Sequence, residues 1–152
     1  MTLEAIQQAA AETLRELDFF NATPVLLEDE GNLPADWDKI AATKSLAVTV
    51  GAADFSPVSR NAHTPAICGM ARFSVKVWER PAWNRTAGAP RAGRSAAEAA
   101  EAVACAVHLL EAGGGTVVCT GIGGVERAED GTVVRTVGFE ALVQLDGGGP
   151  AD

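Results

Sequence analysis

The sequence predicts an α+β domain, in which a mostly antiparallel β-sheet carries two main α-helices on one face and a long arm loop. Apolar residues recur at helical spacing near the N-terminus and again after residue 95. Elsewhere apolar and polar residues alternate, which indicates strands with one buried face. The segments do not follow a regular βαβ order, so a parallel nucleotide-binding sheet is not expected.

Length and composition limit the chain to one domain. It has 152 residues, 47% of them hydrophobic, which suffices for one core but not for two. We expect the domain to span residues 1–145. Residues 146–152, rich in glycine, offer no core side chain and are expected to form a flexible tail. The net charge of −8 argues against general nucleic-acid binding, which requires a basic surface.

Cysteine usage and the N-terminal segment indicate an intracellular protein. Cys68, Cys105 and Cys119 form no Cys-x-x-Cys pair, and an odd number cannot all pair within the chain, so reduced thiols are expected. The first residues show neither the basic nor the apolar region of a signal peptide. No apolar run approaches the roughly 20 residues that a membrane span needs, so no membrane partner is expected.

The first 45 residues predict two helices and a short strand. Residues 2–17 form an amphipathic helix. Residues 19–27 contain a short strand interrupted by Pro24, and an acidic turn follows at 28–32. Residues 33–43 predict a short helix that carries Trp37. The apolar stripe of the first helix consists of Leu3, Ile6, Ala10, Leu14 and Leu17.

Two strands separated by a loop are predicted next. Apolar and polar residues alternate over residues 45–50, which predicts a half-buried strand. Residues 51–64 are rich in the residue types that are typical of loops. Residues 67–79 form a longer strand, whose alternation favours antiparallel pairing. Its core face carries Phe73, Val75 and Val77, and its other face carries Arg72, Ser74, Lys76 and Trp78.

A second long helix follows the arm, from residue 95 to residue 110. Ser95 and Glu98 match a capping box, in which each side chain satisfies a free backbone N–H at the helix start. Gly113 stands where a C-terminal helix cap is expected. The predicted buried stripe consists of Ala99, Val103, Ala106, Val107 and Leu110.

The C-terminal third predicts a β-hairpin. Residues 116–122 and 132–145 alternate as strands, and Asp130-Gly131 between them is a strong turn signal. The glycine clusters at 113–115 and 121–124 lack the lysine of a Walker loop. A helix cap and a β-bulge explain them better than a phosphate site does.

Candidate chemistry is sparse. Cys105 and His108 lie one turn apart on the polar face of the second helix, near Glu101, and such groups serve as metal ligands or as a thiol with its base. A zinc site needs about four ligands, and the only other histidine is His63. Asp36 and Asp38 are better explained as partners of a helix dipole. We therefore expect no catalytic residue, cofactor or metal, and a small enzyme using Cys105/His108 or the Asp36 region is an alternative.

The segment 80–94, here called the arm, is the most specific feature. It holds four of the twelve Lys and Arg residues and no acidic residue, and two tryptophans lie at its root. Tryptophan and arginine are the residues most enriched at interface hot spots. A basic arm on an acidic body suits head-to-tail contact between copies, whereas the alternative is a surface loop that folds back onto its own sheet. The expected subunit-interface residues are Trp78, Arg80, Trp83, Arg85, Arg91 and Arg94.

The element order and one motif resemble a known family. Residues 75–85 read Val-x-Val-Trp-Glu-x-Pro-x-x-Asn-Arg, and an arm and an Ala-rich helix at 95–110 follow. This arrangement resembles small tail-completion proteins of tailed bacteriophages and prophages, including the tail terminators.

That resemblance implies a structural virion subunit without catalysis or cofactor. Members of the family form six-fold rings at the head-proximal end of the tail tube. The implied partners are further copies of the chain, the tail tube protein, the head–tail connector protein and DNA passing through the lumen without sequence-specific binding. The implied location is the virion tail or neck, and the host cytoplasm during assembly. The alternatives are another head–tail connector subunit and a small monomeric binding module.

Overall fold

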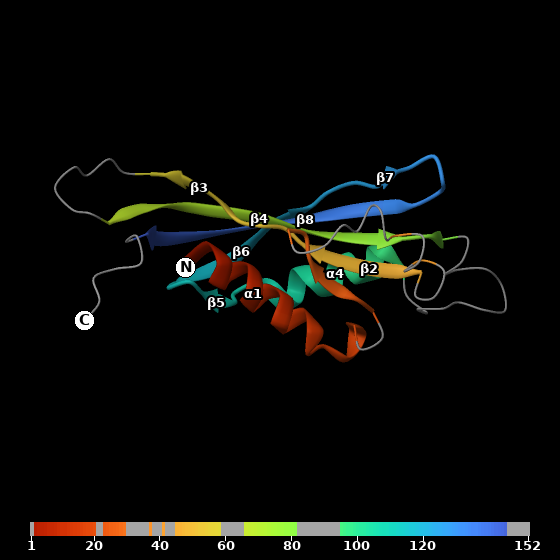
Figure 1. Cartoon of the computed structure of the whole chain (residues 1–152), viewed down its shortest axis with the longest axis horizontal. Helices are drawn as coiled ribbons and strands as arrows, with labels where there is room; N and C mark the ends of the chain where they lie inside the picture. Colours follow the sequence, from red (N-terminus) through yellow and green to blue (C-terminus); the bar gives the residue numbers. More distant parts are fainter. Residues whose placement is uncertain are drawn as a thin grey trace.

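The computed structural model describes residues 2–20, 23–29, 37, 41, 45–58, 66–81 and 95–145. Both long helices lie on the same face of one elongated sheet (Figure 1). This confirms the predicted α+β fold. The helical elements are α1 (Thr2–Arg15), the 3-10 helix η1 (Asp18–Phe20) and α4 (Ala96–Val107). The strands are β1 (Val25–Leu27), β2 (Leu46–Val50), β3 (Asp54–Pro57), β4 (Ile67–Glu79), β5 (Glu111–Ala112), β6 (Gly115–Ile122), β7 (Glu126–Arg127) and β8 (Val133–Leu145).

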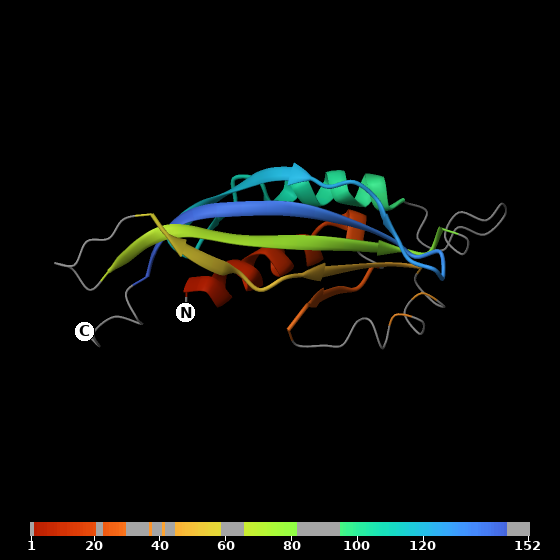
Figure 2. The same ribbon diagram turned by 90° about the horizontal axis from the view of Figure 1, so that it is seen from above.

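The sheet is built around the two longest strands, β4 and β8. They pair antiparallel over their full lengths, from Ile67 opposite Leu145 to Glu79 opposite Val133. The strand order is β1-β2-β4-β8-β6-β5, with β3 beside β4 and β7 beside β8. Every pairing is antiparallel except β1 with β2. Figure 2 shows the long central strands from above, with the helices beneath them.

Helix α1 packs its apolar stripe on the sheet as predicted. Ile6, Ala10 and Leu14 are fully buried. The helix ends at Arg15, two residues earlier than expected, because the chain turns into η1 with Leu17 N–H bonded to Leu14 O at 3.2 Å. The strand predicted at 19–27 is reduced to β1, and Phe19 and Phe20 belong to η1.

Strand β2 is buried on both faces, so the prediction of a half-buried strand is wrong. Val48 lies in the main core, whereas Ala47 on the other face packs with Trp37 and Ala41 in a separate small cluster. Trp37 and Ala41 are helical residues of the predicted helix 33–43, whose other residues lie outside the described part. Trp37 and Ala41 therefore cover part of the second face of β2.

Strand β3 was not predicted, and the assignment of 51–64 to a loop is wrong for Asp54–Pro57. Its pairing with β4 depends on Gly69, which lies opposite Pro57. A Cβ at residue 69 would lie 2.6 Å from Cζ of Phe55, closer than real contacts allow. The missing side chain of Gly69 lets β3 approach, a contact between strands that local patterns do not reveal.

Helix α4 begins as predicted and ends early. Ser95 is the N-cap, and its Oγ accepts the N–H of Glu98 at 3.2 Å. The helix stops at Val107, because His108 leaves helical geometry at ψ 129°. Ala106 and Leu110 are only partly buried, whereas Ala96 and Ala100 join the buried face of the helix.

Gly113 does not cap α4, contrary to the prediction. With Gly114 it forms the two-residue turn between β5 and β6, with φ angles of +62° and +80°. Positive φ at both central residues is the requirement of a type I′ hairpin turn. Because both residues need the left-handed region, glycine at 113 and 114 serves this turn.

The C-terminal hairpin is confirmed. β6 pairs antiparallel with β8, and the register shifts between Cys119 and Gly121, which is the bulge predicted for the second glycine cluster. Gly131 has φ +87° in the turn that precedes β8, as the Asp130-Gly131 signal indicates. None of the described helices has the length and apolar character that crossing a membrane requires.

Candidate assembly interface at the root of the arm

The described residues of the predicted interface, Trp78 and Arg80, lie at the root of the arm. Trp78 is on the outer face of β4, as predicted, and is half-buried. Its Nε1 donates to Thr49 Oγ1 at 3.0 Å, and its ring centroid lies 6.1 Å from that of Trp37. Trp78 therefore contributes to the small outer-face cluster within the subunit.

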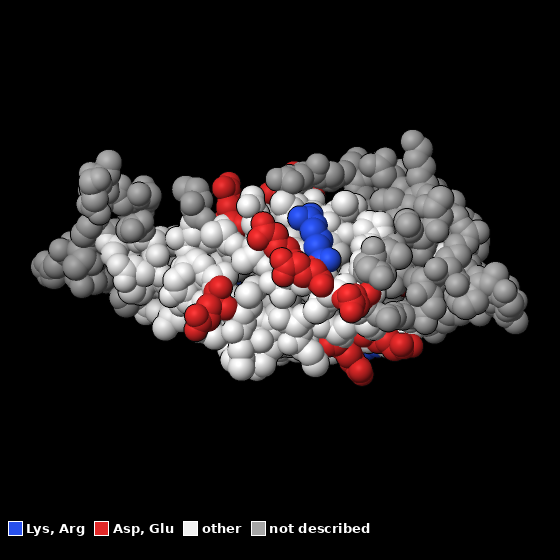
Figure 3. Space-filling model, turned by 90° about the horizontal axis from the view of Figure 1, so that it is seen from below, with Lys and Arg blue, Asp and Glu red and all other residues white. Residues whose placement is uncertain are grey.

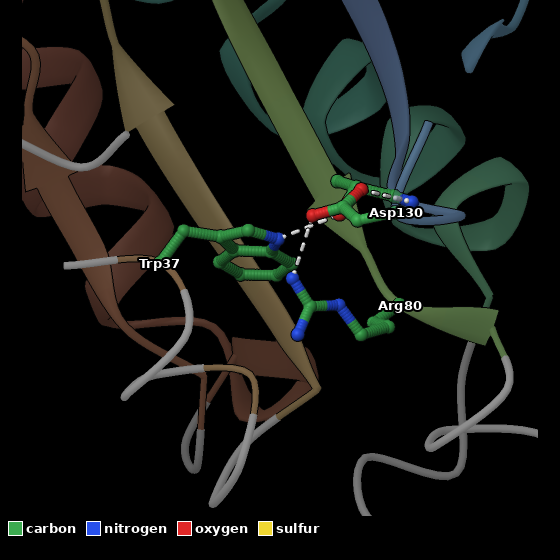
Figure 4. A network of polar contacts seen from close by, with 4 residues as sticks. Trp37, Arg80 and Asp130 are labelled. Atoms are coloured by element: carbon green, nitrogen blue, oxygen red, sulfur yellow. Dashed lines mark hydrogen bonds and ion pairs between the residues drawn. The ribbon is translucent and has the colours of Figure 1, made fainter. Parts of the chain in front are cut away.

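Arg80 is not the exposed arm residue that its charge predicts. Only 7% of the residue is exposed, and its guanidinium lies 5.8 Å from the centroid of the Trp37 ring. One guanidinium nitrogen donates to Asp130 Oδ2 at 2.8 Å. The network brings together three distant segments of the chain, because Trp37 Nε1 also donates to Thr132 Oγ1 at 2.8 Å (Figure 4).

Asp130 is the link between the arm root and the turn before β8. Its Oδ1 accepts the N–H of Thr132 at 2.9 Å, while Oδ2 receives Arg80. The Thr132 backbone and hydroxyl donors, followed by Arg80, hold the pKa of this carboxyl below its usual value of 3.8, and partial burial opposes them.

Glu79 holds the other end of the arm, and sequence reasoning missed it. Its side chain is fully buried, and Oε1 accepts the N–H of Ala96, the first residue of α4, at 3.0 Å. A carboxylate at a helix N-terminus is favoured by the helix dipole and satisfies a free donor. The sequence contained a signal for this position. Glu79 follows Val75 and Val77 at a spacing of two residues along β4, so its side chain lies on the same, core-facing side of the strand.

The two adjacent residues therefore anchor the arm from opposite sides of the sheet. Glu79 faces the helix layer and binds the start of α4, whereas Arg80 binds the turn at Asp130. The hydrogen bond from Ala96 to Glu79 fixes the point where the arm leaves β4 and the point where it returns. Trp83, Arg85, Arg91 and Arg94 lie outside the described residues, so their role stays a prediction.

The helix layer is acidic. Arg15 is the only basic residue of α1 and α4. Figure 3 shows this side of the molecule, where carboxylates are spread across the described surface. The exposed acidic residues of the two helices are Glu4, Glu12, Glu98 and Glu101, and Glu16 directly follows α1.

The two described residues that were proposed for chemistry, Cys105 and His108, do not form part of a metal site within the described part of the chain. Cys105 on α4 and His108 directly after it are exposed, as predicted from the polar face of the expected helix 95–110. Among the described residues, no three His, Cys, Asp or Glu side chains are placed to hold a metal. The His108 Nδ1 instead accepts the backbone N–H of Cys119 at 3.1 Å. His63, Asp36 and Asp38 lie outside the described part.

Comparison with known proteins gives a match in fold but none in sequence family. No protein-family model matches the chain, and no curated protein matches its sequence. The fold matches a chain in the structure described as the virion of a native gene transfer agent particle. The TM-score is 0.62 at 18% sequence identity, and the match covers 93% of this chain and 96% of that chain. At this identity the likeness establishes a shared fold along almost the whole of both chains.

The contacts of Asp130 imply that the stability of the fold depends on pH. The pKa of Asp130 is lower in the folded state than in the unfolded state, so its stabilising contribution is complete above about pH 4 and is lost as the pH falls through the folded value. Half of the side chain is exposed, so screening limits the contribution to roughly 1 kcal/mol or less. Urea unfolding of the native protein and of Asp130→Asn should differ at about pH 7, and the difference in stability should be smaller at about pH 2. An equal difference at both pH values would contradict the assignment.

Proposed function

We propose that this chain is a structural subunit of a phage-like virion. The observation that carries the proposal is the shared fold, because nearly the full length of this chain matches nearly the full length of a chain from a gene transfer agent virion. Within that class, we propose the role of a tail terminator or tail-completion protein.

In this role, copies of the chain form a ring, with six as the expected number, at the head-proximal end of a tail tube. The ring stops tube growth and mediates head–tail joining. Its partners are the tail tube protein and the head–tail connector protein, and DNA passes through its lumen without sequence-specific binding. The protein then resides in the tail or neck of the virion, after assembly in the host cytoplasm.

Charge distribution supports a head-to-tail contact between copies. The acidic helix layer provides one surface, and the arm provides the opposite charge. Arg80 is occupied inside the subunit by Asp130, so the arginines proposed for contact with a neighbour are Arg85, Arg91 and Arg94. Complementary potentials of this kind select partner and orientation, and a repeated heterologous contact closes into a ring.

The anchored root supports the same contact. Because Glu79 and Arg80 hold the ends of the arm to rigid elements, less conformational entropy is lost when the arm binds a neighbour. A hollow of about 250 Å³ beside the root, between the start of α4 and β7, adds an apolar surface. It is lined by Pro81, Ala96, Ala97, Val125, Arg127, Val133 and Arg135.

Charge reversal of the arm tests the proposal. Replacing Arg85 and Arg91 with Glu should weaken self-association at least tenfold, because a repulsive contact replaces an attractive one at each interface. The subunit itself should keep its thermal stability. Sedimentation velocity across a concentration series measures the association, and circular dichroism measures the folding.

The matched control is Arg72→Glu with Lys76→Glu, the same reversal of charge at solvent-accessible positions of β4 outside the arm and outside the hollow beside its root. We expect this pair to weaken association less than the arm variant. Equal effects of the two pairs would remove the arm from the interface, and unchanged association in the arm variant would do the same.

A further inference from the structure

The outer edges of the sheet are positions where another strand is able to add. The main strand order runs from β1 at one edge to β6 and the short β5 at the other, and β3 and β7 also have a single strand neighbour among the described residues. An edge strand presents backbone N–H and C=O groups that pair readily with a second chain. A chain proposed to assemble in many copies must control such pairing, and side chains at the ends of both long helices contact the edges at β1 and β6.

Arg15, the last residue of α1, covers the edge at β1. Its Nε and one terminal nitrogen both donate to Val25 O, at 3.1 and 2.8 Å. This carbonyl faces away from β2, because the neighbouring Pro24 O and Glu28 N make the bonds to β2. The guanidinium therefore occupies the acceptor that an added strand would use at this edge.

His108, which follows the last residue of α4, covers the edge at β6. Leu109 N–H bonds to Val117 O at 2.7 Å, and Val117 N–H bonds to Leu110 O at 2.8 Å. The next outward donor on β6 is the N–H of Cys119, and His108 Nδ1 accepts it at 3.1 Å. The imidazole thus takes the place of the next residue of a neighbouring strand.

The backbone at Leu109 enforces this arrangement. Leu109 has φ +69°, a left-handed conformation that costs a leucine about 1–2 kcal/mol relative to ordinary geometry. Its side chain is 61% exposed, so packing of that side chain does not explain the conformation. The turn brings the chain from α4 directly onto β6 and sets the His108 ring against the edge.

We propose that Arg15 and His108 seal the edges of the sheet at β1 and β6 and prevent strand pairing with a second copy of this chain at these two strands. The two side chains suit what they cover, because a guanidinium fork donates to a carbonyl and a neutral imidazole nitrogen accepts from an N–H. Contacts between copies are thereby directed to other surfaces. This inference goes beyond the proposed function and holds for the chain whatever its final assembly.

The first test is amide hydrogen exchange of the folded protein. In His108→Ala, the Cys119 amide should exchange about tenfold faster, because it loses its acceptor. In His108→Asn, the side-chain oxygen replaces Nδ1, and exchange should stay close to that of the native protein. The Val117 amide, bonded to Leu110 O, is the internal control and should not change. Unchanged exchange of Cys119 in His108→Ala would overturn the assignment of His108.

The second test is association of the double variant Arg15→Met/His108→Ala. It should form β-rich, dye-binding aggregates at concentrations where the native protein does not, whereas Arg15→Lys/His108→Asn should resemble the native protein. Aggregation that is equal in both double variants, or absent from both, would overturn the sealing role. Aggregates and rings are distinguished by electron microscopy, so failure here does not depend on whether the native protein forms rings. The exchange test uses a single exposed substitution and stands if the double variant does not fold.

Discussion

Replacing Val107 with Asp is expected to destabilise the subunit by about 4 kcal/mol or more, which is a large part of the stability of a typical domain. Val107 is fully buried in the main core, at the last position of α4. A carboxylate there would lose its hydration against the apolar sheet, with no charged group of opposite sign in the core cluster. Urea unfolding monitored by circular dichroism measures the effect.

The matched control for Val107→Asp is Cys105→Asp. Cys105 lies two residues earlier on the exposed side of the same helix, so the same new charge stays in water. We expect a loss below about 1 kcal/mol there, mostly from a carboxylate near the negative end of the helix dipole. Soluble Val107→Asp protein with native stability would contradict the placement of α4 on the sheet.

Replacing Glu79 with Ala is expected to cost about 3 kcal/mol. The substitution leaves the buried N–H of Ala96 without its acceptor and opens a cavity between β4 and the start of α4. The effect should exceed that of Ser95→Ala, which removes the exposed N-cap bond to Glu98 and should cost about 1 kcal/mol. Denaturant unfolding of the two variants provides the comparison.

The Glu79→Ala variant also tests the arm. If the buried carboxylate anchors the arm root, self-association should weaken in this variant under conditions where it remains fully folded. A loss of less than about 1 kcal/mol on Glu79→Ala would contradict the role of the carboxylate as a buried partner of α4.

Local patterns in the sequence predict much of the fold. The alternation along β4 and β8 and the stripe of α1 depend on neighbours two to four residues away, and the structure confirms them. The features that the sequence did not predict depend on contacts between distant segments. Burial of both faces of β2 depends on Trp37, and the pairing of β3 depends on Gly69. Neither contact has a signature within its own segment.

The functional residues at the root of the arm were also hard to predict, because their partners are distant in the sequence. Charge alone places Arg80 with the exposed arginines, because its partner Asp130 is fifty residues away in the chain. The spacing of His108 from Cys105 is typical of a ligand or base, yet the partner of His108 is a backbone N–H of β6, which no side-chain motif encodes. Glu79 is the residue that strand parity could have identified, since it continues the core face of β4.

We propose that copies of this chain close into a ring. Negative-stain electron microscopy across a concentration series, with mass from light scattering, tests it most directly. We expect closed rings of uniform diameter, with six times the mass of one chain. A monomer at every concentration, or open filaments without closure, would contradict it.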